Sequence, residues 1–356
     1  MKIKYHLTLA FLGCITICSA VPWVSKDGNV TFKLTAPKAS EVLLRGDWGG
    51  GHVPMVRDDE GVWTLDIQLK PQIYSYSFMV DGVKTIDAAN TALKVGRRAV
   101  AGSIEVLGNP PMPWEMRDVP HGDVISITYN SKAAGDQRRF TVYTPPGYRP
   151  DQEERLPVLY LLHGNGEVES SWVQYGRAHM MADNLLADGK MKPMIIVMPK
   201  GHAYKPASPA GADGRRPSVF KEDLLETIMP IVEKRFQVKT DQPNRAVMGL
   251  SMGGGQAFSI GLGHLDLFSH VGIFSASGRN TEVMAALAAD PAAANEKLKL
   301  FWVACGQLDR GFGRVQKMHD ELTKAGIHHS FKGSEGAHTW INWREYLAET
   351  LPLLFQ

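Results

Sequence analysis

The sequence has little cysteine and no marked excess of charge of either sign. It contains three cysteines in 356 residues, and two of them, Cys14 and Cys18, lie near its start. Only Cys305 remains in the rest of the chain, which excludes an internal disulfide there. Lysine and arginine number 39, and aspartate and glutamate number 37. This balance offers no charge pattern that favours nucleic acid or an anionic membrane surface as a partner.

Long hydrophobic runs are also missing. The apolar run at residues 7–17 is too short to span a bilayer, which takes about 20 residues. Lysines precede it and small residues ending at Ala20 follow it, which is the pattern of a secretory signal peptide. We therefore expect residues 1–20 to be a signal peptide and the protein to be secreted or periplasmic, without a membrane span. A lipoprotein anchor at Cys14 is a less favoured alternative, because the residues before it fit that processing site poorly.

The short motifs of metal and nucleotide enzymes are absent as well. The sequence contains no H-E-x-x-H, no G-x-x-x-x-G-K-[ST], and no G-x-G-x-x-G behind a strand pattern. We therefore expect chemistry that uses no cofactor and no metal ion.

Residues 24–107 show short runs of alternating apolar and polar residues, separated by turn signals such as Asp27-Gly28 and Asp81-Gly82. No helical periodicity of useful length interrupts them. This pattern predicts a small all-β sandwich of about the size of an immunoglobulin-like domain. Strands are predicted at 29–34, 41–45, 63–69 and 73–80.

A proline-rich linker is predicted at 108–120, and a different pattern occupies 121–356. Continuous apolar runs, such as 158–162, predict strands that are covered on both faces. Helical periodicity at 223–236 separates such runs, and Pro230 within it predicts a kink or a break. Strands that alternate with helices predict a mainly parallel sheet with helices on both faces, an α/β architecture.

The sequence G-L-S-M-G at 249–253 is the central motif of this second region. An apolar strand pattern at 245–248 precedes it and a helical pattern at 254–262 follows it. Strand, G-x-S-x-G and helix in this order predict a nucleophile elbow, a sharp turn that projects the serine hydroxyl above the sheet. Ser251 is therefore the candidate nucleophile. The backbone N–H of Met252, at the helix start, is a candidate donor to an oxyanion.

A serine hydroxyl needs a base, and the base needs an acid that fixes its tautomer. In this architecture the acid and then the histidine follow the serine along the chain. Asp309 lies just past an apolar strand pattern at 299–304, and His338 lies in the loop after the strand predicted at 330–332. We predict Asp309 as the acid and His338 as the base. Glu335 stays open as an alternative acid, because it is close to His338 in sequence.

The loop that follows the strand at 158–162 is predicted to supply a second oxyanion donor. It has the sequence H-G-N-G at 163–166. We assign the role to the backbone N–H of Asn165, and we expect His163 to brace the loop rather than to act as a second base.

These motifs resemble carbohydrate esterase family 1, which includes feruloyl esterases, acetylxylan esterases and the esterase D type. The resemblance covers the chain from the linker to its end. It implies an α/β-hydrolase fold and a triad of Ser251, His338 and Asp309. It also implies Asn165 and Met252 as oxyanion donors. The segments that carry the resemblance are 142–148, 160–164, 249–254, the loop at 309, and 336–340.

The first region resembles the family 48 carbohydrate-binding modules in the sequences L-L-R-G-D-W at 43–48 and Y-S-Y-S-F-M-V-D-G at 74–82. This resemblance implies a domain that either binds polysaccharide or only braces the enzyme. Trp48, beside a glycine turn, is the candidate platform for a sugar ring, with packing in the sandwich as an equal alternative. Trp63 and Tyr76 are expected in the core.

The substrate pocket has less definite signals. Trp172, Trp340 and Trp343 are near the site in sequence and are candidates to line an aromatic acyl pocket, although each fits packing equally well. The polar segment at 201–218, rich in proline and glycine, follows a strand end. It is either a lid over the site or an exposed loop.

Together the resemblances imply a secreted serine esterase that removes feruloyl, or other hydroxycinnamoyl, groups from arabinoxylan through an acyl-enzyme. Its partner would be feruloylated or acetylated xylan of the plant cell wall. An acetylxylan esterase is the first alternative. A siderophore esterase, an acyltransferase and a non-catalytic glycan-binding protein are less favoured.

Overall fold

The protein is described from a computed structural model that covers residues 21–97, 100–205, 217–278 and 280–356. The signal peptide predicted at 1–20 lies outside the described residues. The chain divides into two compact units. The first comprises the described residues up to Leu93 together with Ala101–Val106, and the second comprises Lys94–Val100 and Leu107–Gln356.

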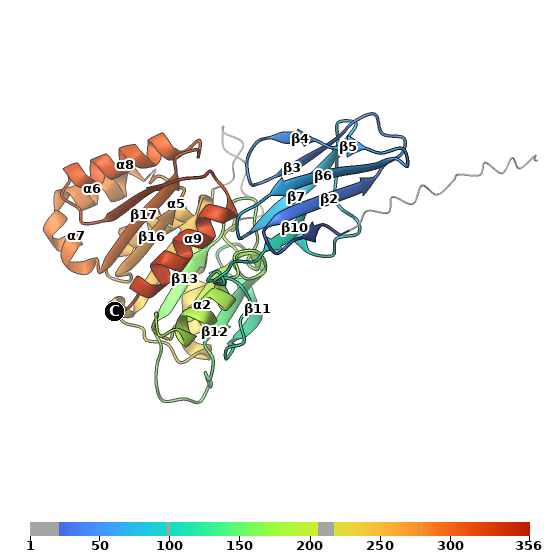
Figure 1. The fold of residues 1–356 in the computed structure, drawn as a ribbon. Coiled ribbons are helices and arrows are strands. Elements are labelled where there is room, and N and C mark those ends of the chain that lie inside the picture. The colour runs from blue at the N-terminus through green and yellow to red at the C-terminus, as the bar shows by residue number, and fades with distance from the viewer. Residues whose placement is uncertain (1–20, 98–99, 206–216, 279) are drawn as a thin grey trace, which may run out of the picture. The chain divides into compact units, whose positions relative to one another are not determined.

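The first unit consists of two antiparallel sheets (Figure 1). One has the strand order β1-β2-β6-β5, and the other has the order β4-β3-β7-β10-β9 with β8 paired to β7. Phe32 from the first sheet meets Tyr76 of the second edge-on, with ring centroids 4.9 Å apart, so the sheets share one core. The strands are β1 Trp23–Val24, β2 Asn29–Thr35, β3 Val42–Gly46, β4 His52–Pro54, β5 Val56–Arg57, β6 Val62–Gln68, β7 Gln72–Val80, β8 Val83–Thr85, β9 Leu93–Val95 and β10 Val100–Val106.

The aromatic residues of this unit pack as an all-β core requires. Trp63 and Tyr76 are buried, which confirms their expected place in the core. Trp48 is half-buried, and its ring lies 5.6 Å from that of Phe32 and 6.0 Å from that of Tyr74. Part of the Trp48 ring is therefore used in packing, and its contact with a sugar stays a prediction.

The second unit is organised around a sheet with the order β11-β12-β14-β13-β15-β16-β17-β18. The β11–β12 hairpin and the β12–β14 pair are antiparallel. The remaining pairs are parallel, so the predicted α/β-hydrolase architecture is confirmed. The strands are β11 Asp123–Ser131, β12 Asp136–Thr144, β13 Val158–Leu162, β14 Ile195–Pro199, β15 Arg245–Leu250, β16 His270–Phe274, β17 Leu300–Gly306 and β18 Ser330–Ser334.

Helices cover both faces of this sheet. Successive residues of a strand point to opposite faces. In β13, Tyr160 belongs to a core cluster shared with the helices α4 (Met229–Arg235), α5 (Met252–Gly261), α6 (Thr281–Ala289) and α8 (Phe312–Lys324). Leu161 therefore points to the other face. On that face the Tyr346 ring of α9 (Trp340–Thr350) packs against Phe274 and Trp302. Helix α2 (Ala178–Ala187) lies beside α9, as Figure 1 shows.

The helical segment predicted at 223–236 forms a helix that runs without a gap from Phe220 to Arg235, and Pro230 does not break it. Its middle, Leu224–Ile228, is π-helical, and Pro230 lies two residues beyond that stretch. Proline has no N–H to give to the preceding turn, which accounts for an irregular hydrogen-bond pattern just before it. The helices are α1 Ser171–Gln174, α2 Ala178–Ala187, α3 Phe220–Asp223, the π-turn η1 Leu224–Ile228, α4 Met229–Arg235, η2 Gln242–Asn244, α5 Met252–Gly261, η3 Leu262–His264, α6 Thr281–Ala289, α7 Pro291–Lys297, α8 Phe312–Lys324, α9 Trp340–Thr350 and η4 Leu351–Leu353.

The parallel strands all end at one edge of the sheet. In this kind of sheet that edge is where ligands bind, and the loops after β13, β15, β17 and β18 hold the residues predicted for the site. Among the described residues, no helix has both the length and the apolar character needed to cross a membrane.

Candidate active site

Ser251 occupies a strained turn between β15 and α5. Its φ is +53°, a value that residues other than glycine rarely adopt. Its N–H donates to the Phe274 carbonyl at 2.8 Å, which holds the turn to the neighbouring strand. A Cβ on Gly249 would lie 2.5 Å from the Gly253 backbone, so β15 and α5 approach closely only because residue 249 lacks a side chain. A Cβ on Gly253 would lie 2.6 Å from the His163 carbonyl, so the helix also packs closely against the loop after β13. This geometry is that of a nucleophile elbow.

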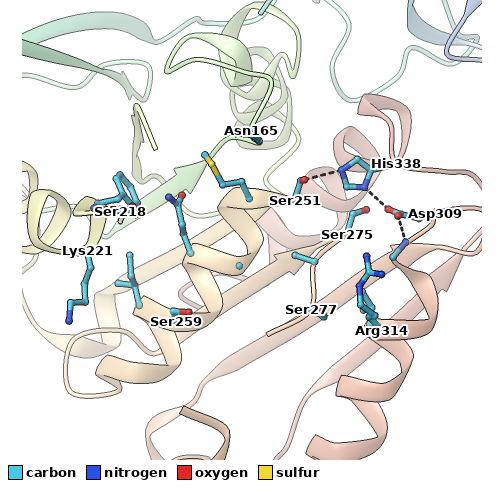
Figure 2. Close-up of a pocket in the computed structure, with 18 of the residues that line it drawn as sticks. Asn165, Ser218, Lys221, Ser251, Ser259, Ser275, Ser277, Asp309, Arg314 and His338 are labelled. Carbon is cyan, nitrogen blue, oxygen red and sulfur yellow. Dashed lines mark hydrogen bonds and ion pairs between the residues drawn. The ribbon is translucent and has the colours of Figure 1, made fainter. Parts of the chain in front are cut away.

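His338 links the other two predicted side chains. Its Nε2 lies 2.9 Å from Ser251 Oγ, and its Nδ1 lies 2.6 Å from Asp309 Oδ2 (Figure 2). His338 comes from the loop between β18 and α9, and Asp309 from the loop between β17 and α8. The Leu308 N–H donates to the Gly336 carbonyl at 2.9 Å and so joins these two loops. The structure therefore brings hydroxyl, imidazole and carboxylate into one hydrogen-bonded series.

The Asp309 carboxylate is buried but well supplied with hydrogen bonds. Burial on its own would raise its pKa, but hydrogen bonds from His338, the Gly311 N–H and the Ser275 hydroxyl outweigh burial and hold the pKa below its ordinary value. The Gly311 bond to Oδ1 measures 2.7 Å. The group thus stays ionised at neutral and mildly acidic pH. Glu335, the alternative acid, is exposed, and Asp309 rather than Glu335 lies at His338 Nδ1.

The three tryptophans predicted for an acyl pocket lie in the interior instead, which corrects that prediction. Trp172 and Trp340 are each 1% exposed, with ring centroids 5.0 Å apart. Their Nε1 atoms donate to the Leu162 carbonyl and to Glu167 Oε1. An indole that buries its ring and satisfies its N–H in this way belongs to the core, because no face of it is left for a ligand.

Trp343 is also buried, but it contacts His338 directly and Asp309 through Ser275. Its Nε1 donates to Ser275 Oγ at 3.0 Å, and its ring meets the His338 ring edge-on with centroids 5.0 Å apart. Ser275 in turn donates to Asp309. Trp343 therefore supports the acid and the base, and it does not line the cleft.

The two predicted oxyanion donors both belong to segments next to Ser251. Met252 is the first residue of α5, and Asn165 lies in the loop after β13. A Cβ on Gly164 would lie 3.4 Å from Ser251 Cβ, so this loop lies directly against the serine. Among the described residues, neither the Asn165 nor the Met252 backbone N–H donates to another protein group. Both are therefore available to a ligand.

His163 braces this loop, as predicted. It is 1% exposed, and burial lowers its pKa to about 4, so it is neutral at physiological pH. The Gly201 N–H donates to its Nε2 at 3.0 Å, and its Nδ1 lies 2.8 Å from the Gly164 carbonyl. Because Nε2 accepts, the ring proton is on Nδ1 and donates to Gly164. Neither nitrogen is free to act as a base.

A cleft of about 1020 Å³ opens above these groups. Ser251, His338, Asp309 and Asn165 lie along it, and Figure 2 shows them converging on one end. Of the segment predicted as lid or loop, residues 206–216 lie outside the described residues, and its two ends pair at Tyr204 and Ser218 beside the cleft. Further lining residues that the sequence analysis did not single out include Tyr204, Phe220, Gln256, Ile260 and Val315.

The sequence carried only a weak signal for these further residues. Gln256 follows Ser251 by five residues, a spacing that does not place two side chains on one face of a helix, so helical periodicity gave no signal for it. Tyr204 and Phe220 lie beyond the carboxyl end of β14 in a segment without a motif. Within the described ranges, no group of three His, Cys, Asp or Glu residues is arranged to hold a metal ion.

Three buried histidines make the protein sensitive to mild acid. Burial lowers the pKa of His163, His202 and His270 from 6.5 to about 4 each. Between these values the unfolded chain binds more protons than the folded one, so the free energy of unfolding falls as the pH drops below 6.5. We expect a loss of roughly 2 kcal/mol per histidine by about pH 4.5. Calorimetric melting between about pH 7.5 and pH 4.5 checks this, and a melting temperature that does not fall would contradict it.

The strand order and the elbow are those of an α/β-hydrolase, and Ser251, His338 and Asp309 form a hydrogen-bonded series at the ligand-binding edge of its sheet. Comparison with known proteins agrees. The model of the Esterase family matches residues 131–354, and the chain belongs to that family.

Relatives of this chain include proteins named for feruloyl ester chemistry. It is 32% identical over 346 residues to an endo-1,4-β-xylanase/feruloyl esterase of Xylanibacter ruminicola. The aligned residues make up 94% of this chain and 46% of that protein. A CE1 ferulic acid esterase from Anaeromyces mucronatus, solved with ferulic acid, is 25% identical to this chain and superposes with a TM-score of 0.58. The superposition covers 68% of this chain and 93% of the Anaeromyces chain. The chain spans less than half the length of the curated relatives it matches.

Another solved structure matches more of the chain than the ferulic acid esterase does. The enterobactin esterase of Shigella flexneri covers 92% of this chain and 93% of its own with a TM-score of 0.67. At 18% identity this likeness shows the fold alone.

Proposed function

We propose that this protein is an exported serine esterase that hydrolyses feruloyl esters on arabinoxylan. The observation that carries the proposal is the series of contacts from Ser251 Oγ to His338 Nε2 at 2.9 Å and from His338 Nδ1 to Asp309 Oδ2 at 2.6 Å. The names of its relatives support the acyl group. Export rests on the sequence of residues 1–20, and xylan binding through Trp48 rests on the resemblance of the first unit to carbohydrate-binding modules.

The proposed reaction has two halves. Ser251 Oγ attacks the ester carbonyl carbon while His338 Nε2 takes the hydroxyl proton, and the backbone N–H groups of Asn165 and Met252 hold the resulting oxyanion. The bond to the sugar oxygen then breaks, and His338 returns the proton to that oxygen. Water next gives a proton to His338 and attacks the acyl carbon. The bond from that carbon to Ser251 Oγ then breaks, and His338 Nε2 returns the proton to Oγ, which releases the hydroxycinnamic acid and restores the Ser251 hydroxyl. Asp309 keeps the Nδ1 proton of His338 in place throughout.

The size and lining of the cleft support an aromatic acyl group rather than acetyl. Its volume of about 1020 Å³ far exceeds what an acetyl group fills. Tyr204, which is partly exposed, gives it aromatic surface, and the partly exposed Met252 and Ala276 add aliphatic surface. A flat cinnamoyl ring would bury apolar area against such side chains, whereas an acetyl group would leave most of the cleft filled with water.

A substrate panel tests the acyl group. We expect methyl ferulate to be cleaved with a kcat/KM at least roughly tenfold above that for acetylated xylan, because only the aromatic acyl group gains the burial energy. Tyr204→Ala should raise the KM for methyl ferulate and change the rate on 4-nitrophenyl acetate much less. Preference for acetylated xylan would replace the proposal by an acetylxylan esterase. Cleavage of a 2,3-dihydroxybenzoyl-serine ester in preference to both would replace it by a siderophore esterase.

A further inference from the structure

The two proposed oxyanion donors sit on separate elements of the chain. The Met252 N–H is fixed by helix α5, but Asn165 lies in a loop between Gly164 and Gly166. Glycine on both sides gives a residue unusual backbone freedom. Stabilisation of an oxyanion requires both N–H groups to be held in place before the reaction, so the loop needs an outside support.

The dipeptide Gly201-His202, just past β14, provides bonds to both elements. The Gly201 N–H donates to His163 Nε2 at 3.0 Å, and its carbonyl accepts from Gln256 Nε2 on helix α5 at 2.9 Å. His202 Nε2 lies 3.1 Å from Asn165 Oδ1. The dipeptide thus spans the gap between the oxyanion loop and the elbow helix.

The environment of His202 fixes how it bonds. The side chain is buried, at 5% exposed, and its ring lies 5.3 Å from that of His163. Burial, with the charges of Arg97 and Lys200 nearby, lowers its pKa to about 4, so it carries one proton at neutral pH. Its Nδ1 has no hydrogen-bond partner among the described residues. The proton therefore belongs on Nε2, where it donates to Asn165 Oδ1, because a buried N–H without an acceptor would cost more.

We propose that His202 is a positioning residue that keeps the Asn165 backbone N–H directed at the same oxyanion position as the Met252 N–H. It does so through the Asn165 side chain, and it touches neither the substrate nor the reacting serine. The inference rests on the proposed serine mechanism, and it adds to that mechanism a residue whose effect is confined to the transition state. The feruloyl specificity is not needed for it.

The test is His202→Ala, assayed with 4-nitrophenyl acetate, an ester that makes no demand on the acyl pocket. We expect kcat to fall roughly tenfold to a hundredfold, less than the ~10²–10³ lost when an oxyanion donor is removed outright. KM should change by no more than about twofold, because the ground state does not carry the oxyanion charge. Benzeneboronic acid, which forms a tetrahedral adduct on an active-site serine, should bind more weakly by a similar factor, while inhibition by ferulic acid stays unchanged.

Two further variants separate positioning from simple destabilisation. His202→Gln keeps an N–H donor at the place of Nε2 and should restore most of the rate. His270→Ala removes another buried histidine, 4% exposed and bonded to Ser269 at the opposite end of β16, so it should lower stability and leave kcat near that of the wild type. Equal losses of kcat in His202→Ala and His270→Ala, or no loss in His202→Ala, would overturn the inference. Activity retained in Ser251→Ala would instead overturn the proposed mechanism, and failure on methyl ferulate alone would overturn only the proposed substrate.

Discussion

Replacing Ser251 by alanine is expected to lower kcat on methyl ferulate by about 10⁴-fold to 10⁶-fold, because no acyl-enzyme can form without the hydroxyl. Among the described residues, the Ser251 hydroxyl is bonded to His338 and to no other group. The fold should therefore keep its melting temperature within a few degrees. Steady-state kinetics with the purified variant, together with a thermal melt, measure both quantities.

A covalent probe provides the control for the same variant. A fluorophosphonate reagent should label the wild-type protein once, at Ser251, and leave Ser251→Ala unlabelled. Near-native hydrolysis by the variant, or labelling of the variant at another serine, would show that the nucleophile lies elsewhere. Binding of insoluble xylan, measured on both proteins, should be unaffected, because the first unit carries that proposed contact.

The elbow could be predicted from sequence because its geometry is local. The steric demand at Gly249, which faces the Gly253 backbone, and the positive φ of Ser251 arise within five consecutive residues, whereas Gly253 is required by its close approach to Leu162 and His163. The partners Asp309 and His338 are distant in sequence, but the architecture constrains them to follow particular strands in a fixed order. The contacts of the His338 imidazole, 2.6 Å to Asp309 and 2.9 Å to Ser251, depend on tertiary structure. The strand order predicts that these residues lie near one another, but it does not predict these distances.

The tryptophan prediction failed for a reason that helical spacing could have revealed. Trp340, Trp343 and Leu347 recur at three and four residues along α9, which is the spacing of a buried apolar stripe. Trp340 and Trp343 are therefore close to His338 in sequence because α9 packs beside the site, not because they line it. His202 and Tyr204 lie in the segment 201–218, which the sequence predicts to be either a lid or an exposed loop, but their individual contacts could not be predicted, because they join segments far apart in the chain and no motif marks them.

Asp309, the proposed acid, gives the second large effect. Asp309→Asn should reduce kcat by about 10⁴-fold and leave KM little changed, because it traps His338 in the wrong tautomer. The Gly311 N–H donates to Oδ1 at 2.7 Å. The asparagine must keep its carbonyl oxygen there, since an NH₂ group would face another donor. Its NH₂ then takes the place of Oδ2 and donates to His338 Nδ1, so the imidazole proton moves to Nε2 and the ring can no longer accept the proton of Ser251.

Glu335→Gln is the matched control, since it makes the same chemical change in the other carboxylate near the base. Glu335 is exposed and its backbone carbonyl, which the change preserves, is the group that accepts from Asn342. Its kcat should stay within about twofold of the wild type, as for surface substitutions away from the site. Were Glu335→Gln to lose activity while Asp309→Asn kept it, the acid would be Glu335, and the 2.6 Å contact at Nδ1 would have no catalytic meaning. The contrast between the two variants thus tests the tautomer argument itself, because both remove one negative charge and only one of them places a donor against the imidazole.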